Sequence, residues 1–177
     1  MRKPIFVIIA VVAVGILILS GFMGSSGKTG SDWQKKIAWA DPAMTKADIA
    51  AKGKPIYLFI STEWCTFCKK MKGETFAAAK VQELLNTLFT PLAINPETEG
   101  TVYFTGEQLT YAELSNKLGV KGYPANFFFR ADGTLIGGQS GYMDPATFAD
   151  LSEYIGDGHY AKYSFSTFQG LPQDKRR

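Results

Sequence analysis

A Cys-x-x-Cys pair stands in this sequence where an apolar, β-rich run gives way to a basic stretch. Cys65 and Cys68 are the only two cysteines of the chain, and they lie between the apolar run 56–60 and the lysine-rich run 69–72. A two-residue gap lets both sulfurs meet across one helical turn, with Cys65 at the helix N-terminus. Unpaired N–H groups and the helix dipole favour a thiolate there, and the thiolate is the nucleophile of disulfide exchange. The pair therefore predicts a redox site.

Other roles for these cysteines depend on what else the chain offers. A structural zinc site needs four ligands, but the chain adds only one histidine, His159, so we expect no metal and no cofactor. A purely structural disulfide would close a very short loop, which stabilises least in the chain-entropy model. Copper(I) binding stays an alternative, because Met71 continues the Cys65/Cys68 spacing and soft sulfur ligands suit that ion. A Cys–His hydrolase is not expected, since the redox pair already accounts for Cys65.

The N-terminal segment indicates export. Arg2 and Lys3 are basic, and an uncharged apolar run follows over residues 5–23. As a helix this run is about as long as the hydrocarbon core of a bilayer is thick. We expect an uncleaved signal anchor over residues 1–23, with cleavage near residues 24–26 as the alternative. The positive-inside rule then places the rest of the chain outside the cytoplasm. In a bacterium this means the periplasmic face of the inner membrane, or the periplasm itself after cleavage.

Composition predicts one globular domain behind this segment. The chain has 177 residues, of which 46% are hydrophobic and 20% charged, and its net charge of +3 is scattered. We therefore expect no nucleic-acid partner. The Gly/Ser-rich stretch 24–32 is interpreted as a flexible linker. The domain is expected over residues 33–160, followed by an aromatic-rich C-terminal extension over 161–177 that packs on it.

Hydrophobic periodicity predicts alternating helices and strands. The expected elements are a helix over 41–52, a strand over 56–61, the Cys65 helix, a helix over 75–88, a strand over 89–94, a helix over 110–118, strands over 125–130 and 134–138, and a helix from Asp144. The polar segment 95–109 has no clear period and is expected to be an insertion or an irregular loop. This order predicts an α/β fold, with a mixed β-sheet flanked by helices on both faces.

The chain resembles the thioredoxin superfamily over about residues 33–160. Four motifs occur in the family's order and spacing: Glu63-Trp64-Cys65-Thr66-Phe67-Cys68-Lys69, Gly119-Val120-Lys121-Gly122-Tyr123-Pro124, Phe127-Phe128-Phe129 with Asp132-Gly133, and Gly141-Tyr142. The chain looks most like the envelope branch of the superfamily. That branch includes the C-terminal domain of the periplasmic thiol:disulfide interchange transporter and thioredoxin-like proteins associated with sulfur oxidation.

The resemblance implies a role for each matching residue. Cys65 would be the thiolate that forms a mixed disulfide with a partner, and Cys68 would resolve it. Trp64 would shield the pair and supply contact surface. Pro124 would be a cis proline opposite the cysteines. Tyr123, directly before it, would offer its backbone to an extended substrate strand.

The chain also departs from the family pattern. Many members carry a buried acid six residues before the first cysteine, as proton acceptor for the resolving thiol; here that residue is Phe59. The proton would then pass to water or to Glu63. Tyr123 is bulky for its position. The inter-cysteine pair Thr66-Phe67 lacks a histidine, which would make the disulfide more oxidising, so its absence favours a reductant. The lysines after Cys68 are expected to lie mostly on the solvated face of their helix.

These features predict a membrane-tethered, extracytoplasmic thiol–disulfide oxidoreductase that reduces partner disulfides. Because the extracytoplasmic side oxidises thiols, such a dithiol needs a membrane thiol electron donor. The expected clients are protein disulfides, such as those of apocytochrome c, other envelope proteins or a sulfur-oxidation component. Two alternatives stay open. One is a disulfide oxidase or isomerase, and the other is a non-enzymatic copper(I)-binding or adaptor protein of the same fold.

Overall fold

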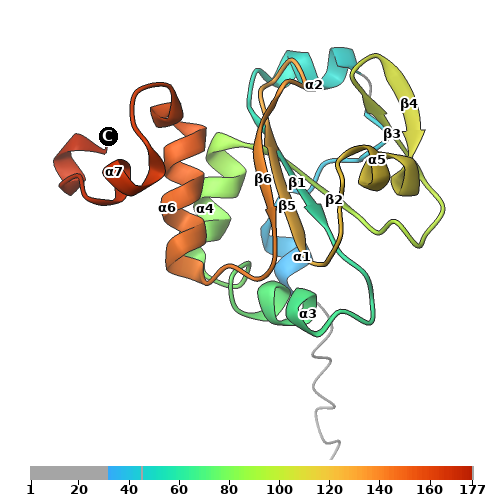
Figure 1. The fold of residues 1–177 in the computed structure, drawn as a ribbon, viewed down its shortest axis with the longest axis horizontal. Helices are drawn as coiled ribbons and strands as arrows, with labels where there is room; N and C mark the ends of the chain where they lie inside the picture. Colours follow the sequence, from blue (N-terminus) through green and yellow to red (C-terminus); the bar gives the residue numbers. More distant parts are fainter. Residues whose placement is uncertain (1–31, 45, 177) are drawn as a thin grey trace, which may run out of the picture. The chain divides into compact units, whose positions relative to one another are not determined.

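The computed structural model describes residues 32–44 and 46–176 (Figure 1). The membrane segment expected over residues 1–23 lies outside these residues, as does nearly all of the linker expected over 24–32. Within the described residues, no helix is both long enough and apolar enough to cross a bilayer.

Four strands form the central sheet, in the order β2-β1-β5-β6. They are β1 (Ile56–Ile60), β2 (Thr90–Ile94), β5 (Ala125–Phe129) and β6 (Leu135–Ser140). β1 and β2 are parallel, whereas β5 runs antiparallel to β1 and β6 antiparallel to β5. The mixed sheet expected from the sequence is confirmed. Every residue of β1 is buried, as its continuous apolar run indicates.

Side chains alternate along β1 and so enter two separate hydrophobic clusters. Tyr57 and Phe59 belong to one cluster and Leu58 to the other. The first cluster is completed by α1 (Asp32–Lys36), α3 (Thr66–Gly73), α4 (Ala79–Leu88) and α6 (Pro145–Gly156). The second is completed by α2 (Lys46–Lys52), α5 (Tyr111–Lys117) and strand β3 (Thr101–Phe104). Figure 1 shows α4 and α6 on one side of the sheet and α5 on the other, so both faces are covered as expected.

Two helices begin later than their periodicity predicts. The helix expected from Asp41 begins at Lys46, because the Asp41 carboxylate accepts a hydrogen bond from the Ala43 N–H and closes a turn. The helix expected from Thr75 begins at Ala79. The Thr75 hydroxyl is buried and donates to the Met143 carbonyl at 2.5 Å, which holds residues 74–78 in a connecting turn instead.

Residues 95–109 were expected to be an insertion or an irregular loop, and the irregular loop is wrong for most of this length. β3 pairs with β4 (Glu107–Thr110) as an antiparallel hairpin. Its turn residues, Thr105 and Gly106, both have positive φ, of 48° and 90°, which is typical of tight two-residue hairpins. Only Val102 of this hairpin is buried. Because so few of its side chains are buried, the hairpin shows little of the alternation of apolar and polar residues by which strands are predicted.

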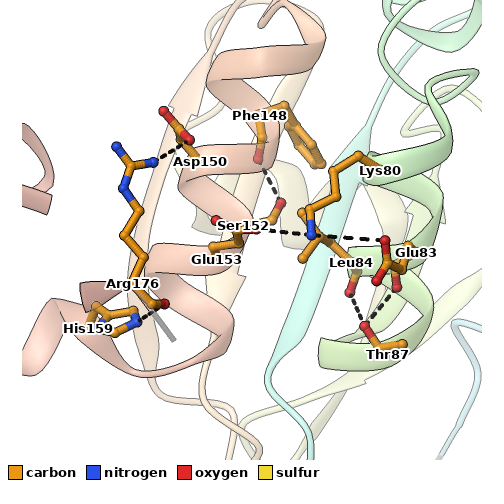
Figure 2. Close-up of polar contacts among 10 residues, drawn as sticks. All are labelled: Lys80, Glu83, Leu84, Thr87, Phe148, Asp150, Ser152, Glu153, His159 and Arg176. Atoms are coloured by element: carbon orange, nitrogen blue, oxygen red, sulfur yellow. Dashed lines mark hydrogen bonds and ion pairs between the residues drawn. The ribbon is translucent and has the colours of Figure 1, made fainter. Parts of the chain in front are cut away.

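The C-terminal segment packs against α6 through its last described residue, Arg176 (Figure 2). It comprises η1 (His159–Ala161), α7 (Phe165–Gln169) and η2 (Gln173–Lys175). The Arg176 guanidinium donates to Asp150 Oδ1 of α6 at 3.0 Å and to the carbonyls of Leu171 and Gln169. The Arg176 carbonyl lies 3.0 Å from His159 Nε2. The side chain and carbonyl of Arg176 therefore link the end of the C-terminal segment to α6, to α7 and to η1.

Candidate redox site

Cys65 and Cys68 form a disulfide at the N-terminus of α3, with their Cα atoms 5.2 Å apart. Cys65 is the N-cap residue, and its Sγ accepts a hydrogen bond from the Cys68 N–H at 3.0 Å. Cys68 is fully buried and Cys65 is 4% exposed. A backbone donor directed at Sγ, together with the helix dipole, favours negative charge on Cys65 once the bond is reduced. The sulfur with a favoured thiolate is thus also the one nearer to solvent.

Trp64 connects the cysteine motif to two other parts of the chain. Its side chain is 65% exposed, and its Nε1 donates to Glu97 Oε1 at 2.8 Å. Its ring meets the Tyr123 ring edge-on, with centroids 5.9 Å apart. The structure therefore brings the second family motif, around Tyr123, up against the first.

The Tyr123–Pro124 peptide bond is cis, as the resemblance implies. Pro124 is buried directly before β5, and its carbonyl accepts a hydrogen bond from the Gly141 N–H at 2.7 Å. The Tyr123 N–H and carbonyl take part in none of the backbone hydrogen bonds found in the described residues. The backbone of Tyr123 is thus available for pairing with another chain.

Two exposed aromatic rings and the half-buried Tyr123 belong to the two motifs that meet at the redox site. Phe67, between the two cysteines, is 59% exposed, close to the 65% of Trp64. We call Trp64, Phe67 and Tyr123 the aromatic rim. Large apolar side chains gathered at one place on a surface mark a site of contact with another molecule.

Glu63 does not bind to the cysteines. Its side chain is 83% exposed, and its Oε1 lies 3.9 Å from the Lys72 Nζ. Within the part of the chain that the structure describes, no hydrogen bond joins Glu63 to Cys65 or Cys68. A proton could pass between Glu63 and the cysteines only through water.

Lys69 and Lys70 are exposed, as expected for most of these lysines, whereas Lys72 is half-buried. Its side chain is 18% exposed, and its Nζ lies 5.3 Å from the Trp33 ring centroid and 6.0 Å from that of Phe59. Burial lowers the pKa of Lys72, the Glu63 carboxylate raises it, and the Lys69 charge lowers it further. Phe59, which stands where the resemblance implies a buried acid, is thus a buried phenyl ring with the Lys72 ammonium 6.0 Å from its centroid.

The remaining candidate ligands and bases lie elsewhere. Met71, the residue that suggested a copper(I) site, is fully buried in the aromatic cluster behind the disulfide. His159 stacks on Phe168 in the C-terminal segment, with ring centroids 4.9 Å apart. Among the described residues, no group of three or more His, Cys, Asp or Glu side chains could hold a metal ion.

Sequence reasoning missed the partners of the motif residues. Glu97 lies in a polar segment without a pattern, and nothing local connects it to Trp64. The buried Asn126, which accepts from the Tyr57 hydroxyl at 2.7 Å and donates to the Gly141 carbonyl at 3.3 Å, reads in the sequence only as a strand residue. Lys72 did leave a signal: it follows Cys68 by four residues, the spacing at which side chains of one helix are neighbours.

The site and the fold together define the class of the protein. A cysteine pair that forms a disulfide at a helix N-terminus, beside a cis proline and a rim of exposed aromatic rings, belongs to a thiol–disulfide oxidoreductase.

Comparisons with known proteins give the family. Residues 42–156 match the family model of the thioredoxin-like domain, so the chain belongs to this family. It is 33% identical over 116 residues to the thiol:disulfide interchange protein DsbD of Cronobacter sakazakii. That match covers 64% of this chain and 18% of the relative. A second relative, the protein of the same name from Yersinia pestis, is 34% identical over 101 residues, which are 55% of this chain and 15% of that protein.

Solved structures show the same fold at low sequence identity. A thioredoxin-fold protein from Helicobacter pylori superposes with a TM-score of 0.65 and 17% identity, over 77% of this chain and 94% of that one. A thioredoxin from Thermus thermophilus gives a TM-score of 0.55 and 19% identity, over 73% of this chain and 99% of that one. The thioredoxin-like fold expected from the motifs is confirmed.

Proposed function

We propose that this chain is a membrane-tethered, extracytoplasmic oxidoreductase that reduces disulfides in partner proteins. The observation that carries the proposal is the asymmetry of the disulfide. Cys65 is the N-cap of α3 and keeps 4% of its surface exposed, whereas Cys68 is fully buried. An outer sulfur with a favoured thiolate and a shielded inner sulfur suit a two-step exchange.

In the first step the Cys65 thiolate attacks one sulfur of the client disulfide. A mixed disulfide forms, the client bond breaks, and the other client sulfur leaves as a thiolate. In the second step Cys68 loses its proton and attacks the Cys65 sulfur, which releases the second client thiolate. The dithiol has then given two electrons to the client, and the client thiolates take up protons from water. Because Phe59 offers no base, Glu63 is the carboxylate proposed to accept the Cys68 proton, through water.

The client would lie against the aromatic rim. Trp64 supplies exposed apolar area next to Cys65, and its bond to Glu97 restricts how its ring can turn. Tyr123, before the cis Pro124, offers a backbone N–H and carbonyl to an extended client strand. The site would then recognise a client mainly through the client's backbone and through the apolar side chains near its cysteine.

The proposed location depends on the N-terminal sequence. The apolar run over residues 5–23, behind Arg2 and Lys3, supports a signal anchor over 1–23 and a linker over 24–32. The domain would cover 33–160 and the extension 161–177. Electrons would come from a membrane thiol donor, and clients would be envelope proteins such as apocytochrome c. Similarity to part of proteins named for thiol:disulfide interchange supports the exchange chemistry.

Insulin reduction with dithiothreitol as donor tests the proposal. The full chain should accelerate the reaction, Cys65→Ser should abolish the acceleration, and Cys68→Ser should accumulate a mixed disulfide. Unchanged acceleration by Cys65→Ser would contradict the proposed chemistry. The reduction potential then decides the direction: a value below about −230 mV supports a reductant, and one above about −180 mV an oxidase or isomerase.

A further inference from the structure

The Lys72 side chain runs back along α3 toward the disulfide. Lys72 lies one helical turn after Cys68, and side chains on a helix lean toward its N-terminus. Its Nζ comes within 3.9 Å of the carboxylate of Glu63, a residue that precedes Cys65 in the chain. The ammonium therefore lies toward the N-terminal end of α3, the end that carries the disulfide.

The surroundings of this ammonium let its charge act over a distance. α1 contributes the Trp33 ring and β1 the Phe59 ring, at 5.3 and 6.0 Å from Nζ. Of the charged groups on the elements around it, Glu63 and Lys69 act on it. Glu63 is 83% exposed, so water screens it, while the Lys72 side chain is only 18% exposed. Charges at the edge of an apolar region interact more strongly than charges in water.

We infer that Lys72 is the residue that sets the thiolate affinity and the redox potential of the Cys65–Cys68 pair, with Glu63 attenuating it. The inference rests on the proposed exchange chemistry. Reduction of the disulfide takes up two electrons, and one proton if Cys65 ends as a thiolate and Cys68 as a thiol. A nearby cation stabilises that thiolate, so it lowers the pKa of Cys65 and makes the disulfide easier to reduce and the pair more oxidising. The Glu63 carboxylate opposes this effect and so favours the reducing direction proposed above.

Substitution of each member of the ion pair gives the test, because the two should act in opposite directions. In the full chain, Lys72→Met should raise the pH midpoint for alkylation of Cys65 by iodoacetamide and should disfavour reduction by dithiothreitol. Glu63→Gln should lower the midpoint and favour reduction. We expect changes of roughly three- to tenfold in each equilibrium constant. A tenfold change corresponds to about 30 mV for this two-electron couple.

Two control variants separate charge from packing. Lys72→Arg keeps the positive charge and should stay within about twofold of the unmodified chain. Lys70→Met removes the same charge from the same helix, but the Lys70 Nζ lies beside Glu74 at 3.9 Å and over the Tyr142 ring at 4.4 Å. It should therefore change both constants much less than Lys72→Met does.

Several results would overturn the inference. They are equal shifts in Lys72→Met and Lys70→Met, shifts of the same sign in Lys72→Met and Glu63→Gln, or no rescue by Lys72→Arg. If Lys72→Met fails to fold, the sign of the Glu63→Gln shift decides. Alkylation needs no client, so these shifts are measured even if Cys65→Ser leaves insulin reduction unchanged. In that case the proposed function fails, and the electrostatic inference is still judged by its own result.

Discussion

The redox end and the C-terminal end of this domain differ in how many of their side-chain and backbone groups have partners within the chain. At the redox end, Trp64 and Phe67 remain more than half exposed, and the backbone of Tyr123 has no partner in the described residues. At the C-terminal end, Arg176 is 9% exposed, and each guanidinium nitrogen donates a hydrogen bond. The first end leaves interactions open for another molecule, while the second completes its interactions within the chain.

The buried Arg176 and the half-buried Lys72 sharpen this contrast. Arg176 makes a 3.0 Å ion pair with Asp150 and bonds to two carbonyls, so its charge has a partner and each of its three nitrogens donates a hydrogen bond. Among residues 32–44 and 46–176, Lys72 has as partners an exposed carboxylate at 3.9 Å and two aromatic rings. A matched charge mainly stabilises the fold, whereas a poorly matched one influences neighbouring groups that gain or lose charge. Substitutions at the two ends should therefore change different observables.

Arg176→Met should have the largest effect on stability. It keeps an unbranched apolar stem but leaves the Asp150 carboxylate and the carbonyls of Gln169 and Leu171 without their donor. We expect the free energy of unfolding in urea to fall by about 2–4 kcal/mol. The redox potential of the Cys65–Cys68 pair should not change, since the substitution is in another part of the fold. If the free energy of unfolding falls by less than about 0.5 kcal/mol, Arg176 behaves as an ordinary surface residue and the contrast with Lys72 is lost.

Trp64→Ala should affect exchange with proteins rather than stability. The ring is largely exposed, so its removal costs little in folding, but a docked client loses apolar contact area. We expect the rate of insulin reduction to fall about tenfold, which is about 1.4 kcal/mol of transition-state stabilisation. Reduction of a small disulfide such as oxidised glutathione should keep its rate, because it does not cover the aromatic rim.

Leu135→Ala is the matched control for Trp64→Ala. Leu135 is 52% exposed, but it pairs with Phe129 at the end of the sheet away from Pro124. Its removal should leave both rates unchanged. Two results would mean that the aromatic rim does not bind the client. One is an equal fall of the insulin-reduction rate in Trp64→Ala and Leu135→Ala, and the other is an equal fall of the Trp64→Ala rates with insulin and with oxidised glutathione.

Local signals in the sequence predicted the elements that hold the redox site. The unbroken apolar run gave β1, and the Thr110–Glu113 capping box and the N-cap Asp144 gave the starts of α5 and α6, which the structure confirms. Each of these signals depends on residues close together in the chain. That is why the positions of both cysteines at the start of a helix could be predicted before any tertiary contact was known.

The missed features all depend on contacts between distant residues. The late start of α4 comes from a hydrogen bond between Thr75 and Met143, which are 68 residues apart. The bond from Trp64 to Glu97 spans 33 residues. The burial of Lys72 depends on Trp33 of α1, a short helix that the sequence interpretation did not predict. Charge pattern alone indicated a solvated lysine, and packing against two aromatic rings outweighed it.

Lys80→Met should have the smallest effect and so tests whether burial, rather than ion pairing itself, distinguishes Arg176. Lys80 joins α4 to α6 through Glu153 at 3.1 Å and also lies 3.9 Å from Glu83 (Figure 2). Its side chain is 53% exposed, so water and salt screen both ion pairs. We expect the free energy of unfolding to fall by less than about 1 kcal/mol. The loss should shrink further in high salt, whereas the loss caused by Arg176→Met should persist. A salt-independent loss as large as that of Arg176→Met would show that ion pairing between elements, and not the burial of the hydrogen-bonded guanidinium, stabilises this end of the domain.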